Sequence, residues 1–129
     1  MGDRANIVLN FGPRRCQEDT RDYDPIYLYT HWGGTEMPHR LAVALKHGEG
    51  RWDDVTYLAR IIVSQVVLNH DELTGYGLSP YECDNEHKYI HVTLEEQTVT
   101  IGEKTWTYKE YVAATTEEIN KHYLGEDED

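Results

Sequence analysis

A short segment between a predicted strand and a predicted helix carries the residue types best suited to binding a small ligand. The segment reads THWGGTE and spans residues 30–36. Two adjacent glycines let the backbone approach a ligand closely, and the free N–H groups at the start of a helix form an anion site. An indole such as that of Trp32 can stack on a ring. The candidate ligand-binding residues are His31, Trp32, Gly33, Gly34, Arg40 and Arg51.

Each part of this candidate site also has a purely structural interpretation. The segment lacks the spacing of a phosphate-binding P-loop and that of a dinucleotide fingerprint, so an ordinary turn is the alternative for the two glycines. The sequence RWDD at residues 51–54 either forms a rim of the same pocket or only caps and packs the helix that follows it.

The acidic residues of the C-terminal half are candidates for binding a protein partner. Met1–His70 carries eight Lys or Arg against nine Asp or Glu, whereas Asp71–Asp129 carries four Lys against fifteen Asp or Glu. The second half therefore holds a net charge of −11 out of the −12 of the whole chain. Such a surface attracts basic partners and repels phosphate backbones, so we expect a basic protein surface as the partner and no direct binding of nucleic acid.

The predicted partner-binding residues are Glu82, Asp84, Glu86, Glu95 and Glu96. They fall in a predicted loop and at the tip of a predicted hairpin. The alternative is a solvated acidic edge that only discourages sheet-to-sheet aggregation.

Metal and catalytic patterns are weak. Cys83, His87 and His91 are spaced by four residues and would share one face of a continuous strand, where Asp84 or Glu86 could complete a zinc site. The sequence Asp-Asn-Glu at residues 84–86 is typical of a turn, however, and the spacing matches no common zinc pattern. No order of Ser, His and Asp or of Cys and His identifies a triad. We therefore expect no metal and no other cofactor, and an enzyme ranks behind a binding function.

The cysteine content and the apolar runs favour a cytoplasmic protein. The two cysteines, Cys16 and Cys83, do not form the disulfide framework of a small secreted domain. The segment Met1–Arg4 has no apolar signal region, and no apolar run approaches the roughly 18 residues of a membrane span. We expect no membrane contact, and the oligomeric state stays open.

The elements that would position these residues form one α+β domain over residues 1–124, followed by an acidic disordered tail over residues 125–129. Strands are predicted over Ala5–Phe11 and Ile26–His31, with an exposed loop over Arg14–Asp24 between them. A first helix is predicted over Met37–His47. A second begins at Asp53 or Asp54 and extends to about Leu68. Its broad apolar stripe predicts that it packs against the sheet as the buried centre of the domain.

The C-terminal half is predicted to add strands and one long helix. A strand is expected over Gly75–Cys83, a hairpin over His87–Leu94 and Gln97–Ile101, and a short last strand over Lys104–Thr107. In the hairpin, Tyr89, His91 and Thr93 are predicted to face one way, and Ile90, Val92 and Leu94 to face the core. Thr107 and Glu110 form a capping box that opens a helix to about Tyr123, and Trp106 and Tyr111 stand at the positions of a hydrophobic staple. The element order ββααβββα predicts a mostly antiparallel sheet of about five strands packed by two to three helices.

Five sequence motifs resemble those of small, mostly uncharacterised proteins of phages and mobile bacterial elements. The motifs are IYLYTHWGG (26–34), RWDD (51–54), YLAR (57–60), TGYG (74–77) and CDNEH (83–87). The resemblance extends from about Asn6 to Ile101. It implies a phage or prophage context, in which small acidic proteins often inhibit host defences, and it assigns no role to any residue.

Two classes of function follow from these features. In the first, the protein is a non-enzymatic inhibitor of a host defence complex, comparable to an anti-CRISPR protein, whose acidic half docks on a basic surface of that complex. In the second, it binds or sequesters a small molecule such as a nucleotide signal. That function would use the turn at Trp32–Gly34 with Arg40 and Arg51.

Overall fold

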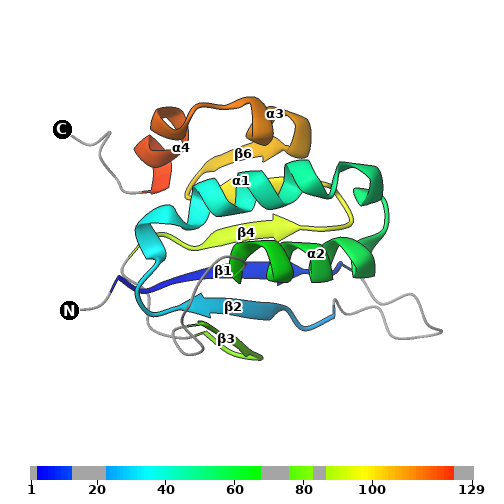
Figure 1. The fold of residues 1–129 in the computed structure, drawn as a ribbon, viewed down its shortest axis with the longest axis horizontal. Helices are drawn as coiled ribbons and strands as arrows, with labels where there is room; N and C mark the ends of the chain where they lie inside the picture. Colours follow the sequence, from blue (N-terminus) through cyan, green and yellow to red (C-terminus); the bar gives the residue numbers. More distant parts are fainter. Residues whose placement is uncertain (1–2, 13–22, 68–75, 83–86, 124–129) are drawn as a thin grey trace.

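The structure is a computed structural model that describes residues 3–12, 23–67, 76–82 and 87–123. Within these ranges, six strands form one mixed sheet and four α-helices lie against one of its faces (Figure 1). This confirms the α+β class. The predicted tail at residues 125–129 and most of the predicted loop Arg14–Asp24 lie outside the described residues.

The sheet has the strand order β3-β2-β1-β4-β5-β6. Its strands are β1 (Ala5–Asn10), β2 (Ile26–Thr30), β3 (Tyr76–Ser79), β4 (Ile90–Thr93), β5 (Thr98–Ile101) and β6 (Lys104–Thr107). All neighbouring strands are antiparallel except β1 and β4, which run parallel. The sheet is therefore mostly antiparallel, as predicted, but it has one strand more than the expected five.

The third strand is shorter than the predicted Gly75–Cys83. It ends at Ser79, and Pro80 follows. A proline has no N–H to donate to the ladder, so a strand seldom continues through it except at an edge.

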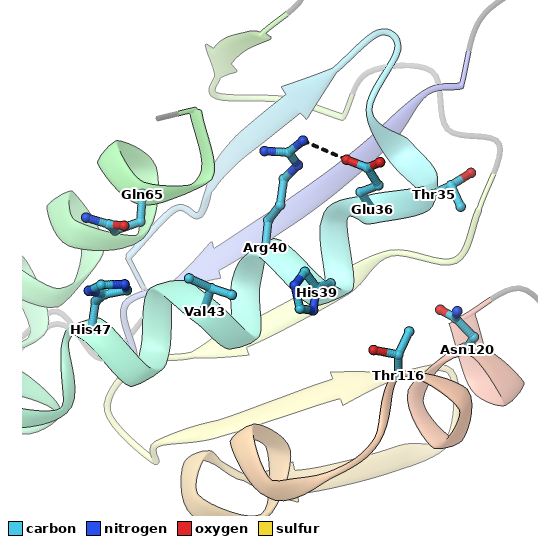
Figure 2. Close-up of a pocket in the computed structure, with 9 residues that line it drawn as sticks. All are labelled: Thr35, Glu36, His39, Arg40, Val43, His47, Gln65, Thr116 and Asn120. Carbon is cyan, nitrogen blue, oxygen red and sulfur yellow. Dashed lines mark hydrogen bonds and ion pairs between the residues drawn. The ribbon is translucent and has the colours of Figure 1, made fainter. Parts of the chain in front are cut away.

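Both central helices form where the apolar spacing predicts them. α1 spans Met37–His47 and α2 spans Val55–Val67, with short 3₁₀ turns before each at Gly34–Glu36 and Glu49–Arg51. Asp54 caps α2, because its carboxylate accepts the N–H of Tyr57 at 3.4 Å. Figure 2 shows the solvent side of α1. The side chains on that side are Glu36, His39, Arg40, Val43 and His47.

The helix at the centre of the domain is α1, and the prediction that the second helix holds this place is wrong. α1 buries Met37, Pro38, Leu41, Ala44 and Leu45. α2 buries fewer residues, namely Leu58, Ile62 and Val66. The reason lies in the neighbours: α1 contacts α2 on one side and the C-terminal helices α3 and α4 on the other. The width of an apolar stripe does not report how many elements surround a helix.

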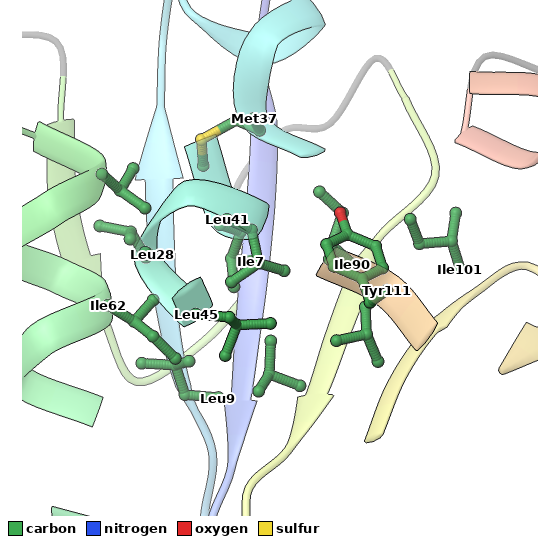
Figure 3. Packing of buried hydrophobic residues seen from close by; sticks show 14 of the residues in the cluster. Ile7, Leu9, Leu28, Met37, Leu41, Leu45, Ile62, Ile90, Ile101 and Tyr111 are labelled. Atoms are coloured by element: carbon green, nitrogen blue, oxygen red, sulfur yellow. The ribbon is translucent and has the colours of Figure 1, made fainter. Parts of the chain in front are cut away.

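The core fills the space between the helices and one face of the sheet (Figure 3). Ile7 and Leu9 of β1 and Ile90 of β4 form its floor, and Leu41 and Leu45 of α1 pack onto them. All five side chains are at most 1% exposed. None of the helices in the described ranges is long and apolar enough to cross a membrane.

The C-terminal segment forms two helices, so the single helix predicted up to Tyr123 is wrong. α3 spans Tyr108–Ala113 and α4 spans Thr116–Tyr123. The predicted capping box is confirmed, since the Thr107 hydroxyl accepts the N–H of Glu110 at 3.1 Å and the Glu110 carboxylate accepts the N–H of Thr107 at 3.0 Å. A second box with the same two distances joins Thr115 and Glu118. Thr115 therefore starts a new helix instead of continuing the old one.

Candidate functional site

The turn that precedes α1 already binds a carboxylate, and that carboxylate belongs to the chain itself. The N–H of Thr35 donates to Oδ2 of Asp3 at 2.8 Å, and the N–H of Gly34 donates to the backbone oxygen of Asp3 at 2.8 Å. The N–H of Gly33 donates to the hydroxyl of Thr30 at 3.0 Å. The groups predicted to attract an external anion thus all have partners within the protein. Asp3 occupies the place in which a bound anion would lie.

The two glycines are explained by close approach. A Cβ on Gly34 would lie 2.5 Å from the backbone oxygen of Asp3, and one on Gly33 would lie 2.8 Å from the hydroxyl oxygen of Tyr76. A side chain on Gly34 would collide with the backbone, and one on Gly33 would require the Tyr76 side chain to shift. The glycines thus leave room for Asp3 and Tyr76 of the same chain, whereas the sequence suggested that they leave room for a ligand.

Asp3 connects this turn to His87 and, through it, to the end of α4. Nε2 of His87 lies 2.5 Å from Oδ1 of Asp3, and the imidazole stacks on Tyr123 with 4.9 Å between ring centroids. The Tyr123 hydroxyl donates to the backbone oxygen of Gly34 at 2.7 Å. Burial raises the pKa of the Asp3 carboxyl, but its hydrogen bonds with His87 and Thr35 outweigh that effect, so the pKa is lowered. The carboxylate is therefore held in its ionised form.

The aromatic residues beside the turn remain accessible. Trp32 is 50% exposed. His31 meets it edge-on, with 4.8 Å between ring centroids, and Nδ1 of His31 lies 3.0 Å from the hydroxyl of Tyr29. About half of the Trp32 side chain is therefore accessible to a partner or ligand.

The two arginines of the predicted ligand site lie at opposite ends of α1. Arg40 is in its first half and bonds to Glu36, with 2.6 Å between Nη2 and Oε1. Arg51 follows the helix, lies 3.7 Å from Asp54 and packs over the ring of Tyr57 at 4.8 Å. A helix of 11 residues is about 16 Å long, so the structure brings Arg40 near the turn and places Arg51 away from it.

The predicted partner-binding carboxylates fall at the two ends of β4. Glu82 is exposed, and its carboxylate accepts the hydroxyl of Tyr89 at 3.4 Å, just before β4 begins. Glu95 and Glu96 lie in the turn that follows β4. Asp84 and Glu86 lie outside the described residues. Among the described residues, β4 thus has Glu82 near its first residue and Glu95 and Glu96 after its last.

Between these positions lies the face of the sheet on which none of the described helices packs. We call it the open face. Its side chains alternate along the strands with those of the core. On β1 they are Asn6 and Val8, which are buried, and around these two lie Tyr27, Tyr29, Tyr89, His91, Thr93, Thr98, Thr100 and Thr105. The eight surrounding side chains are half-buried or exposed, whereas Ile90 and Val92, which alternate with His91, are fully buried. The sequence pattern predicted that Tyr89, His91 and Thr93 share a face, but it gave no strand order with which to join them to Tyr27 and Tyr29.

His91 lies at the middle of the open face. Partial burial lowers the pKa of its imidazole, and the Glu82 carboxylate offsets only part of this effect. Its Nδ1 lies 3.4 Å from the amide nitrogen of Asn10 on the neighbouring strand. The neutral form of His91 is therefore favoured, and the centre of the open face carries little charge at neutral pH.

The residues of the possible zinc site do not converge. His87 faces Asp3, whereas His91 lies on the open face. Cys83 lies outside the described residues. Among the residues that the structure describes, no group of three or more His, Cys, Asp or Glu side chains could hold a metal ion.

Neither the turn nor the open face can be interpreted by analogy. No protein family, no curated protein and no solved structure matches this chain.

Proposed function

We propose that this protein is a non-enzymatic binding protein of the cytoplasm that docks on a basic surface of another protein. The observation that carries this proposal is the open face, a sheet surface rich in tyrosine and threonine that the described helices leave uncovered. Tyrosine is enriched at protein interfaces, because its ring supplies a large contact area at a small entropic cost and its hydroxyl can form a hydrogen bond.

The charge of the chain supports a basic partner. Most of the net charge of −12 belongs to the half that contains β4, β5 and β6. Glu82 lies at one end of β4, and Glu95 and Glu96 lie at the other. Acidic groups at the rim of an interface speed association with a basic surface and orient the two proteins.

A surface that binds nucleic acid is the basic surface that fits best. Such surfaces carry Lys and Arg side chains that neutralise phosphates, and an acidic protein can cover them. The resemblance to proteins of phages and mobile elements supports the same idea, since a protein that covers such a surface would inhibit a host defence complex. A small-molecule function is the second candidate, and the groove along α1 that is described below favours it.

The test is capture of host proteins by three forms of the immobilised full-length protein. The first is the unchanged protein, and the second carries Glu82→Lys, Glu95→Lys and Glu96→Lys. The control carries Glu49→Lys, Asp53→Lys and Glu117→Lys, which alter the net charge equally at exposed positions in and around the helices. A second pair of variants, Tyr27→Ser on the open face and the exposed Tyr57→Ser on α2, tests the aromatic contact without a change of charge.

We expect the unchanged protein and both controls to retain a basic, nucleic-acid-binding protein that added nucleic acid displaces. We expect the variant with Glu82→Lys, Glu95→Lys and Glu96→Lys to lose this protein, and Tyr27→Ser to lose it as well. If the two sets of charge changes weaken capture equally, net charge rather than the open face drives binding. If a captured protein is retained by Tyr27→Ser and lost by Tyr57→Ser, the docking surface lies on the helices and the proposal is wrong.

A further inference from the structure

A groove of about 740 Å³ follows the solvent side of α1. In Figure 2, His39, Arg40, Val43 and His47 succeed one another along the helix, with Gln65 of α2 on one side and Asn120 of α4 on the other. A second hollow of about 320 Å³ shares His39 and Val43 with it and adds Lys46. The volume of the larger groove is within the range of about 300–1,000 Å³ that small-molecule sites occupy.

The helix along which this groove runs is basic, whereas the molecule as a whole is acidic. α1 carries His39, Arg40, Lys46 and His47 and no acidic residue. Glu36, which precedes α1, is the one carboxylate among the residues that line the larger groove. A small anion is attracted by such a local cluster, whereas a long polyanion is repelled by the net charge of −12. The groove therefore suits a small anionic molecule better than a nucleic acid.

Arg40 is held in a way that leaves it available to a ligand. One of its Nη atoms donates to Glu36, while its Nε is buried and has no hydrogen-bond partner in the described part of the chain. The Glu36 side chain is 65% exposed and makes no hydrogen bond to the helix end that it caps. It can therefore move aside at little cost. A phosphate could then bind the guanidinium through two parallel bonds, which are stronger than the single bond to Glu36.

The rest of the groove offers groups for an uncharged part of the ligand. Oδ1 of Asn120 is buried and, among the described residues, has no donor. Gln65 supplies a second amide, and Val43 is 37% exposed between them and gives an apolar contact. A buried acceptor without a partner favours a ligand that brings an N–H or O–H group. These groups fit a polar ring that carries its own donors.

We propose that the groove along α1 binds a small organic phosphate with a nitrogen-containing ring, the chemistry of a nucleotide. Arg40 binds the phosphate in place of Glu36, and the buried Oδ1 of Asn120 accepts a hydrogen bond from the ring. The site does not include the turn at Trp32–Gly34 and is separate from the open face.

The proposal is tested by calorimetric titration of the full-length protein with adenosine and guanosine monophosphates, their cyclic forms, adenosine and inorganic phosphate. We expect saturable binding of one nucleotide per chain and at least about tenfold weaker binding of adenosine, which lacks the charged group. Arg40→Gln should weaken nucleotide binding at least about tenfold. The matched control is Arg60→Gln, which removes the same charge from an exposed side chain of α2 that bonds to Ser64 outside the groove.

Two further variants separate the parts of the site. Glu36→Gln should tighten binding severalfold because it removes the internal competitor for Arg40. Asn120→Ala should weaken the binding of nucleotide but not of inorganic phosphate. Absence of binding by both the unchanged protein and Glu36→Gln at about 10 mM ligand, a limit weaker than most biological affinities, would overturn the proposal. Equal effects of Arg40→Gln and Arg60→Gln, or equal affinity for nucleotide and inorganic phosphate, would also overturn it.

Discussion

Replacing Tyr111 with phenylalanine tests whether a single buried hydroxyl joins α3 to α1. The ring of Tyr111 lies in the core (Figure 3) and is 0% exposed, and its hydroxyl donates to the backbone oxygen of Pro38 at 2.8 Å. Tyr111→Phe keeps the ring and its edge-on contact with Trp106, at 5.4 Å between centroids. The substitution thus removes one hydrogen bond and leaves the packing intact.

The expected loss of stability can be worked out from this geometry. Leaving a buried carbonyl without a donor costs about 1–3 kcal/mol. The oxygen of Pro38 lies in a helix and keeps a main-chain donor there, so we expect about 1–2 kcal/mol. At about 2.1 cal/mol/K per residue, a chain of this length has an unfolding entropy near 0.27 kcal/mol/K, so the Tm should fall by about 4–7 °C.

Urea denaturation followed by circular dichroism measures this change. The control is Tyr57→Phe on α2, where the side chain is 53% exposed and the expected change is within about 0.5 kcal/mol. Tyr111→Ala should cost more, about 3–5 kcal/mol, because it also leaves a cavity. If Tyr111→Phe behaves as the Tyr57 control does, while Tyr111→Ala is strongly destabilised, the hydrogen bond to Pro38 contributes nothing.

Four further outcomes follow from the packing, the caps and the buried titratable groups. Ile62→Ala should lower the free energy of unfolding by about 2–5 kcal/mol, and a value near zero in denaturant titration would mean that this side of α2 faces solvent. Thr115→Ala should cost about 0.5–2 kcal/mol, and an unchanged midpoint would show that the second capping box does not hold α4 in place. Burial raises the pKa of Tyr108, Tyr111 and Tyr123, whereas the same phenols ionise near pH 10 once unfolded. As the pH rises, the unfolded chain therefore loses these protons before the folded one does, and the free energy of unfolding should fall above about pH 10. A free energy of unfolding that stays constant from pH 9 to pH 11 (about one unit on either side of that value) would contradict the burial of these phenols. The lowered pKa of Asp3 has the opposite sign, so its contribution should be lost as the pH falls below about 4, and Asp3→Asn should make this acid limb shallower if the carboxylate is responsible.

Local patterns predicted the elements that depend on near neighbours in the sequence. The alternation around Ile90 and Val92 predicted the β4–β5 hairpin, and the structure confirms their burial. The Thr107 capping box and the staple of Trp106 on Tyr111 were visible because all their members lie within five residues. The Thr115 box had the same pattern, but the apolar spacing continues across it through Ile119 and Tyr123. That spacing favoured one long helix.

The candidate site depended on contacts that no local pattern reports. The partner of the turn before α1 is Asp3, and the imidazole that bonds to Asp3 lies 84 residues further along the chain. Only the strand order brings these groups together. The separation of Arg40 from Arg51 could have been predicted, since the rise of a helix sets the distance between its ends. The open face could not, because it requires knowing that β1 joins β2 to β4.

The central place of β1 also determines the order in which the chain can complete its fold during synthesis. One edge of β1 can pair with β2 soon after β2 leaves the ribosome. The other edge pairs with β4, so the pairing of Ile7 with Ile90 must wait until β4 has been synthesised. At about 5–20 residues per second, this wait lasts roughly 4–17 s. Throughout it, the apolar segment Ala5–Asn10 presents an unpaired strand edge to the rest of the cell. The nascent chain is thus most prone to aggregation in this interval, and closure of β4 on β1, a pairing of high contact order, sets the pace of folding.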